Sequence, residues 1–255
     1  MASIGIYIVG GAIEEEENEA GLTLLTARTM LKGTTTRTAA QIAEDAEMLG
    51  GTISASAGSD SFGWSFSVPG ARLPEALELL GDVIQRSTIP NDSFETERTV
   101  ALSNVAMLRD DMYRYPMRLA SSVAFGGHPY GRPVMGTEES LRAIPVERAR
   151  EWHKTKVLES AAVIGVVADI DVKEAADSLD DATREANERG KQGDASAHRL
   201  EQIIEERRCR DLARHFDEVD GEPQLKEVLV RKYVGCRGRS VAIDDERPAD
   251  EHLGE

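Results

Sequence analysis

Over the first 170 residues, the sequence divides into short blocks with two patterns of apolar residues. In some blocks every second residue is apolar, and in others the apolar residues lie three or four positions apart. An apolar run over 4–9 predicts an opening strand, and alternation over 52–57 and 61–68 predicts a β-hairpin. In the second strand of this hairpin, large apolar residues occupy every other position and so share one face of the strand: Phe62, Trp64, Phe66 and Val68. We interpret this stripe as core.

Apolar residues spaced three or four apart predict helices between the strands. The expected helices span 21–31, 38–49, 72–85, 91 to about 115, a shorter stretch ending at 125, and 146–156. Pro116 is expected to interrupt the long helix, whose inward face would hold Val100 or Ala101, Val105, Leu108 and Met112. A last apolar run over 161–167 predicts a returning strand. This order predicts an α+β fold, a largely antiparallel sheet with helices packed on one face.

The chain changes character near residue 171. Residues 1–170 carry 23 acids and 15 bases, and the remaining 85 residues carry the same numbers, so the density of charge doubles. Dense charge with few apolar residues is typical of segments that cannot bury enough surface to fold. We therefore predict a folded, C-terminally incomplete domain over 1–179 and a charged tail over 180–255 that is disordered or aberrant.

Composition excludes several classes of function. The net charge of −16 disfavours binding to nucleic acid or to anionic membranes. Two cysteines are too few for a disulfide scaffold or a cysteine-rich zinc module. No apolar run is long enough to span a membrane, and no signal peptide is visible. The compartment stays open, either periplasm or cytoplasm in a bacterium.

Between the predicted elements, a series of short motifs occurs in one order. The motifs are Gly10-Gly11, Met30-Leu31-Lys32-Gly33-Thr34, Arg37, Leu49-Gly50-Gly51, Phe94 with Glu97-Arg98, Gly127-His128-Pro129-Tyr130-Gly131, Gly136-Thr137 and Ala168-Asp169-Ile170-Asp171. Together they resemble the insulinase/pitrilysin family of zinc peptidases, which includes the mitochondrial processing peptidases. The resemblance covers about residues 1–171.

The resemblance implies where a zinc site would lie. Active members carry His-x-x-Glu-His on the helix leading into Lys32-Gly33-Thr34, with two zinc ligands and a glutamate as general base. Counted back from these residues, the histidine positions are Leu24 and Arg28 and the base position is Ala27; the distal ligand position on the long helix is Asn104. Leucine and alanine do not bind zinc, and a protonated arginine repels it. We therefore expect no zinc and no hydrolysis at this site.

The family also implies a role for a domain without zinc. Its members resemble clamshells of homologous domains, of which one carries zinc while others close a chamber, contact peptide or serve as inactive partners. We expect a non-catalytic domain that pairs with a homologous catalytic domain or subunit and encloses or binds unfolded peptide, with zinc only in that partner. One alternative is a structural assembly subunit without a peptidase role. Another is a truncated or frame-shifted fragment of a larger peptidase.

The remaining ionisable residues predict structural roles. The acidic run over 14–17 is typical of a solvated loop, and Glu97 is expected to pair with Arg28 across two helices. His128 is expected to stabilise its Gly-His-Pro-Tyr-Gly loop, with substrate contact as the alternative. We predict that His153 is a packing residue at the surface or half-buried.

Overall fold

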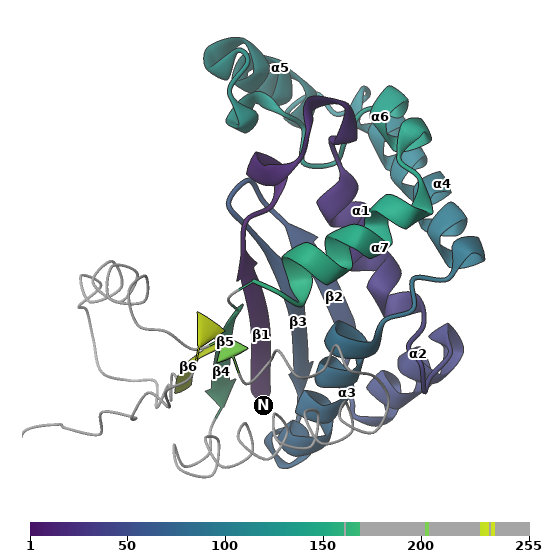
Figure 1. Ribbon diagram of the computed structural model, residues 1–255, viewed down its shortest axis with the longest axis vertical. Helices are drawn as coiled ribbons and strands as arrows, with labels where there is room; N and C mark the ends of the chain where they lie inside the picture. The colour runs from purple at the N-terminus through teal and green to yellow at the C-terminus, as the bar shows by residue number, and fades with distance from the viewer. Residues whose placement is uncertain (161, 169–201, 204–229, 235, 238–255) are drawn as a thin grey trace, which may run out of the picture.

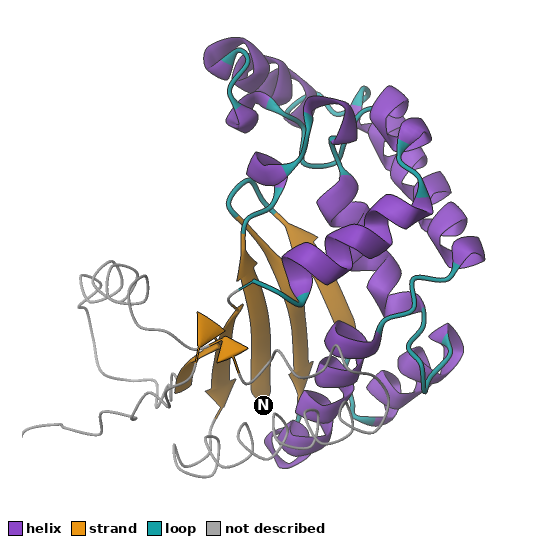
Figure 2. Cartoon of the chain, in the orientation of Figure 1, coloured by secondary structure: helices purple, strands orange, loops and turns teal. Residues whose placement is uncertain are grey.

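The computed structural model describes residues 1–160, 162–168, 202–203, 230–234 and 236–237. They form the predicted α+β fold, in which helices cover one side of an antiparallel sheet (Figure 2). The sheet has five strands in the order β2-β3-β1-β4-β6. Their bounds are β1 Ala2–Val9, β2 Ile53–Ala57, β3 Ser61–Val68, β4 Ala162–Ala168 and β6 Val230–Val234. A separate pair joins β5 Gln202–Ile203 to β7 Cys236–Arg237.

Seven α-helices lie among the described residues (Figure 1). They are α1 Leu22–Thr29, α2 Ala39–Met48, α3 Leu73–Arg86, α4 Asn91–Leu108, α5 Arg114–Phe125, α6 Glu138–Ala143 and α7 Val146–Trp152. A 3₁₀ turn over Met30–Lys32 extends α1, and a π-helical turn over His153–Val157 extends α7. None of the helices within the described part of the chain is long and apolar enough to cross a membrane.

β1 lies at the centre of the sheet and fixes its register. Ile6 is opposite Trp64 of β3 on one side and Ile164 of β4 on the other. The predicted aromatic stripe of β3 forms the core, since all four of its members are at most 2% exposed. The other face of β1 and β3 is more exposed, and Ser3 and Ser67 form a hydrogen bond across it at 2.9 Å. Such one-sided burial is typical of an antiparallel sheet covered by helices on one face.

The prediction that the long helix reaches residue 115 is wrong beyond Leu108. α4 ends at Leu108, and α5 begins at Arg114 after a turn. Asp111 starts the new helix, because its Oδ1 accepts hydrogen bonds from the backbone N–H groups of Tyr113 and Arg114 at 2.9 and 2.8 Å. Pro116 therefore lies in the first turn of α5, where a missing N–H costs nothing.

The predicted inward face of the long helix is correct only in part. Val105 is buried, and Ala101 and Leu108 are half-buried. Val100 is 42% exposed, and Met112 lies in the turn after α4 at 76% exposed. α6 was not predicted because it is only six residues long; a capping box between Thr137 and Ser140 begins it.

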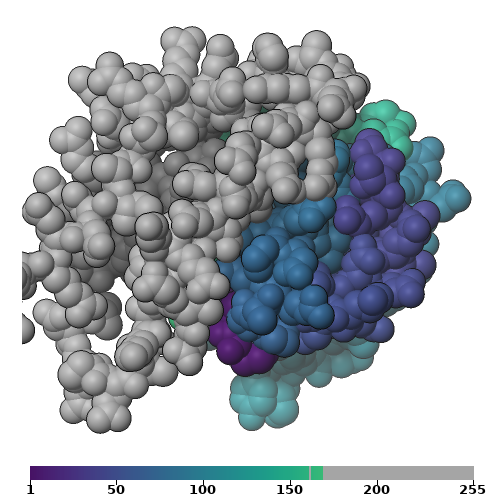
Figure 3. All heavy atoms as spheres, turned by 90° about the horizontal axis from the view of Figure 1, so that it is seen from below, coloured from purple at the N-terminus to yellow at the C-terminus, as the bar shows by residue number. Residues whose placement is uncertain are grey.

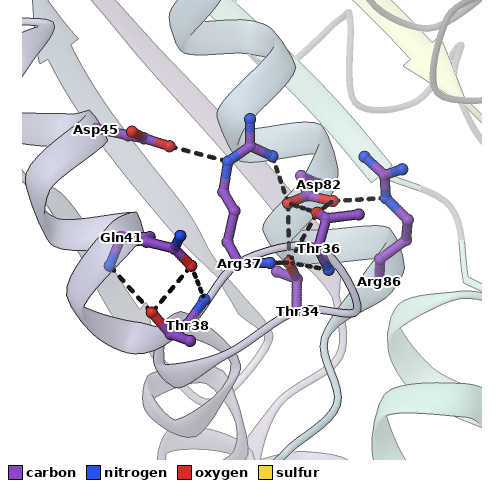
Figure 4. A network of polar contacts seen from close by, with 8 residues as sticks. All are labelled: Thr34, Thr36, Arg37, Thr38, Gln41, Asp45, Asp82 and Arg86. Carbon is purple, nitrogen blue, oxygen red and sulfur yellow. Dashed lines mark hydrogen bonds and ion pairs between the residues drawn. The ribbon is translucent and has the colours of Figure 1, made fainter.

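A buried carboxylate joins α3 to the loop that precedes α2 (Figure 4). The Asp82 side chain is fully buried and accepts hydrogen bonds from the hydroxyl groups of Thr34 and Thr36, each at 2.9 Å. It also forms ion pairs with Arg37 at 2.6 Å and with Arg86 at 2.5 Å. Burial alone would raise the pKa of Asp82, but the hydrogen bonds from Arg37, Thr34 and Thr36 outweigh it and hold the pKa below its usual value.

The α2 helix is fixed at its first turn as well. Thr38 and Gln41 form a reciprocal capping box, and Arg37 reaches Asp45 on the next turn at 2.9 Å. As a result α2 and α3 lie side by side and form much of the coloured surface seen from below in Figure 3. The prediction of a charged tail over 180–255 lies almost entirely outside the described residues, so it stays a prediction.

Candidate functional site

The α1 helix begins at a buried carboxylate from the acidic run. Glu15 accepts hydrogen bonds from the backbone N–H groups of Gly21 at 2.9 Å and Thr23 at 2.8 Å. Glu15 is only 3% exposed, so the prediction of a wholly solvated loop is wrong at this residue. Burial raises the pKa of Glu15 despite these hydrogen bonds. Gly21 has φ +93°, and a Cβ there would meet Gly136 at 2.8 Å, so the entry to α1 requires glycine.

One side of α1 packs on the sheet and the other faces α4. Leu22 and Leu25 are buried in the core. Ala27 is 1% exposed, and its carbonyl oxygen accepts a hydrogen bond from the indole N–H of Trp64 at 3.0 Å. The position that the resemblance assigns to the general base is therefore filled by a small residue, and the backbone of this residue is hydrogen-bonded to a side chain of β3.

A small cavity of about 10 Å³ lies between α1 and α4. It is lined by Gly21, Leu24, Leu25, Arg28, Ala101, Asn104, Met135 and Leu141. Leu24 and Arg28 come from adjacent turns of α1, and Asn104 comes from the facing turn of α4. Three of the four positions singled out from the sequence thus meet at one cavity, and Ala27 lies beside it in the core.

The chemistry of this cavity does not fit zinc. Structural and catalytic zinc ions take thiolate, imidazole or carboxylate ligands, and the cavity offers an alkyl chain, a guanidinium and a carboxamide. Within the described residues, no group of three or more histidine, cysteine, aspartate or glutamate side chains could hold a metal ion. No metal-dependent step is therefore assigned to these residues.

The prediction that Glu97 pairs with Arg28 is wrong. Glu97 forms an ion pair with Lys32 at 3.1 Å. Lys32 lies one helical turn after Arg28, in the 3₁₀ turn that extends α1. Among the described residues, Arg28 makes no side-chain hydrogen bond or ion pair, although it is half-buried.

The two histidines considered as candidates lie away from this cavity. His128 accepts a hydrogen bond from the backbone N–H of Tyr130 through Nδ1 at 3.2 Å and packs edge-on against the Tyr130 ring. His153 is buried, with Nε2 2.7 Å from the carbonyl oxygen of Ile84, and burial lowers its pKa. It is more buried than expected from the sequence.

A second feature of the same end of the molecule is an exposed apolar face on the segment over 107–125. α5 projects away from the sheet (Figure 1) and contains no buried residue. Large apolar side chains are exposed along this face: Met107, Met112, Tyr113, Met117, Leu119, Val123 and Phe125. Sequence reasoning missed it because the long helix predicted to reach residue 115 placed Met112 on its inward face.

Solved structures of peptidases share this fold. A protease from Helicobacter pylori superposes with a TM-score of 0.64 at 18% identity, over 71% of this chain and 44% of that one. A peptidase M16 inactive domain from Pseudomonas fluorescens superposes with a TM-score of 0.61 at 18% identity, over 72% and 45%. The fold is therefore that of an M16 peptidase half-domain.

The family follows from the sequence itself. The sequence model of the insulinase family, peptidase family M16, matches residues 1–138, which is more than half of the chain, and the chain belongs to this family. An uncharacterized zinc protease of Mycobacterium leprae is 30% identical over 67% of this chain and 38% of its own length. The mitochondrial-processing peptidase subunit beta of Dictyostelium discoideum is 25% identical over 60% and 33%. The chain thus spans between a third and two fifths of the length of these relatives.

Proposed function

We propose that this chain is a non-catalytic insulinase-family domain that pairs with a zinc-bearing homologue and helps to enclose or bind peptide. The observation that carries this proposal is the cavity between α1 and α4. The positions assigned to the metal ligands, Leu24, Arg28 and Asn104, gather there without one zinc donor of the usual kinds. Ala27, in the position of the base, has no side chain that could activate water.

The exposed face over 107–125 supports pairing. So many large apolar side chains exposed on one short segment are unusual on a monomer and mark interaction sites. The relatives are long enough to contain such a partner domain, since about three fifths of their length lies outside the matched segment. In them a second domain of this size would fit within the same chain. We therefore assign this face to a homologous M16 domain.

Pairing is tested by co-expressing the full chain with a homologue that carries His-x-x-Glu-His and measuring their association by analytical ultracentrifugation. The proposal predicts a complex between the two, and Val123→Asp, which charges a residue that is 83% exposed, should weaken it by tenfold or more. Met48→Asp is the matched control, because Met48 is 77% exposed on α2, away from this face. Equal effects of both variants would contradict the assignment of the face.

Hydrolysis gives the second test. The chain alone should not cleave an unfolded peptide, and a chelator should make no difference to that result. Chelator-sensitive cleavage by the chain alone would overturn the non-catalytic role. A chain that assembles only with unrelated proteins would favour the structural-subunit alternative.

A further inference from the structure

The cavity between α1 and α4 places an unpaired cation in apolar surroundings. Arg28 forms no ion pair among the described residues. Two carboxylates that flank α1 are already engaged: Glu97 with Lys32, and Glu15 with the first N–H groups of the helix. The positive charge of Arg28 is therefore not neutralised within the described structure.

The other walls of the cavity suit an anion with planar oxygens. Asn104 brings a carboxamide from α4, whose N–H₂ group can donate. Leu24, Ala101 and Met135 contribute apolar surface, and a charged hydrogen bond is stronger beside apolar surface than in open water. A guanidinium matches the two oxygens of a carboxylate with two parallel hydrogen bonds.

The size of the cavity limits what can enter. A volume of about 10 Å³ holds roughly one water-sized group. One carboxylate oxygen can replace such a group while the second oxygen remains at the mouth. A whole side chain cannot enter.

We propose that this cavity binds one carboxylate of a peptide, with Arg28 and Asn104 as the donors. The peptide part of the proposal rests on the proposed function; the carboxylate chemistry rests on the cavity. The carboxylate can come from the C-terminus of the peptide or from a glutamate side chain. In either case the site that the resemblance assigns to a metal cation is occupied by a fixed cation of the protein.

The test uses the full chain and four short peptides, observed by NMR through the Arg28 Nε–H group and the Leu24 and Met135 methyl groups. The peptides are acetyl-pentaalanine with a free C-terminus, the same peptide as an amide, and two amidated peptides with a central Glu or Gln. The free-acid or the Glu peptide should shift these signals, and the amide and Gln peptides should not. A shift by only one carboxylate peptide identifies the source; no shift by either overturns the proposal.

Variants assign the effect to Arg28. Arg28→Gln should weaken carboxylate binding by about tenfold or more, because it removes a charge-assisted hydrogen bond. Arg28→Lys keeps the charge but loses the two parallel hydrogen bonds. Its affinity for the carboxylate should therefore lie between that of the natural chain and that of Arg28→Gln. Arg72→Gln is the matched control, since Arg72 is exposed at the start of α3 and its loss changes the net charge equally. If Arg72→Gln weakens binding as much as Arg28→Gln, the cavity is not the site.

The same variants separate this inference from the proposed function. Association with the catalytic homologue, without carboxylate binding, overturns the cavity inference and leaves the proposed function intact. Carboxylate binding without association with the homologue overturns the proposed function and leaves the cavity inference intact. Arg28→Lys also keeps the test valid if Arg28→Gln fails to fold.

Discussion

Replacing Asp82 with asparagine removes the buried carboxylate that joins α3 to the loop before α2. The folded protein then retains two arginines, Arg37 and Arg86, whose ion-pair partner has become neutral. Breaking a fully buried ion pair costs about 3–5 kcal/mol, because a charge is left uncompensated. The two arginine side chains keep 25% and 22% of their solvent exposure, so water can partly solvate them. We therefore expect Asp82→Asn to lower the free energy of unfolding by about 3 kcal/mol.

Urea denaturation of the full chain, followed by tryptophan fluorescence, measures this loss. Trp64 and Trp152 are fully buried and report on unfolding of the domain. Asp45→Asn is the matched control, because Asp45 is 43% exposed and its only ion pair among the described residues is with Arg37. This variant should lower the free energy of unfolding by less than about 1 kcal/mol. If Asp82→Asn lowers the free energy of unfolding by no more than Asp45→Asn does, the Asp82 network does not stabilise the fold.

The network also predicts a dependence on pH. The pKa of Asp82 is lower in the folded chain than its ordinary value of 3.8, so the unfolded chain binds the proton more readily. The stability from Asp82 is therefore present above pH 3.8 and is lost as the pH falls further through the folded pKa. Asp82→Asn should flatten this acid limb of the stability curve, and an unchanged limb would contradict the assignment.

Two further predictions concern α4 and α7. In double-mutant cycles with alanine, Lys32 and Glu97 should couple by about 0.3–1 kcal/mol, whereas Arg28 and Glu97 should be additive; the opposite pattern would refute the pairing observed here. Burial lowers the pKa of His153 below its ordinary value of 6.5, so the unfolded chain binds the proton more readily and stability should fall as the pH drops below 6.5. His153→Gln should reduce that slope in pH-dependent urea unfolding, and an unaltered slope would count against the buried neutral imidazole.

Periodicity predicted the elements that pack in the core. The alternation in β3 identified its buried face, and helical periodicity over 38–49 located α2, because both signals are local. The fold class followed from the order of these elements. The break between α4 and α5 was misplaced, since Pro116 suggested a stop although the cap at Asp111 determines the boundary.

The candidate site required the folded structure. Spacing within α1 placed Leu24 and Arg28 on one face, but only the packing of α1 on α4 brings Asn104 to the same cavity. Glu15 was missed because one buried carboxylate within an acidic run has no distinguishing pattern in the sequence. The partner of Glu97 depends on the register between α1 and α4, which helical periodicity does not determine.

The most direct test of a non-catalytic site is a zinc titration of the full chain and of the triple variant L24H/R28H/N104E. The three substituted positions line one cavity, so two imidazoles and a carboxylate placed there can share a metal ion. Isothermal titration calorimetry should show no zinc binding at this cavity in the natural chain and about one equivalent in the variant. Stoichiometric zinc binding by the natural chain, lost on Asn104→Ala, would contradict the account.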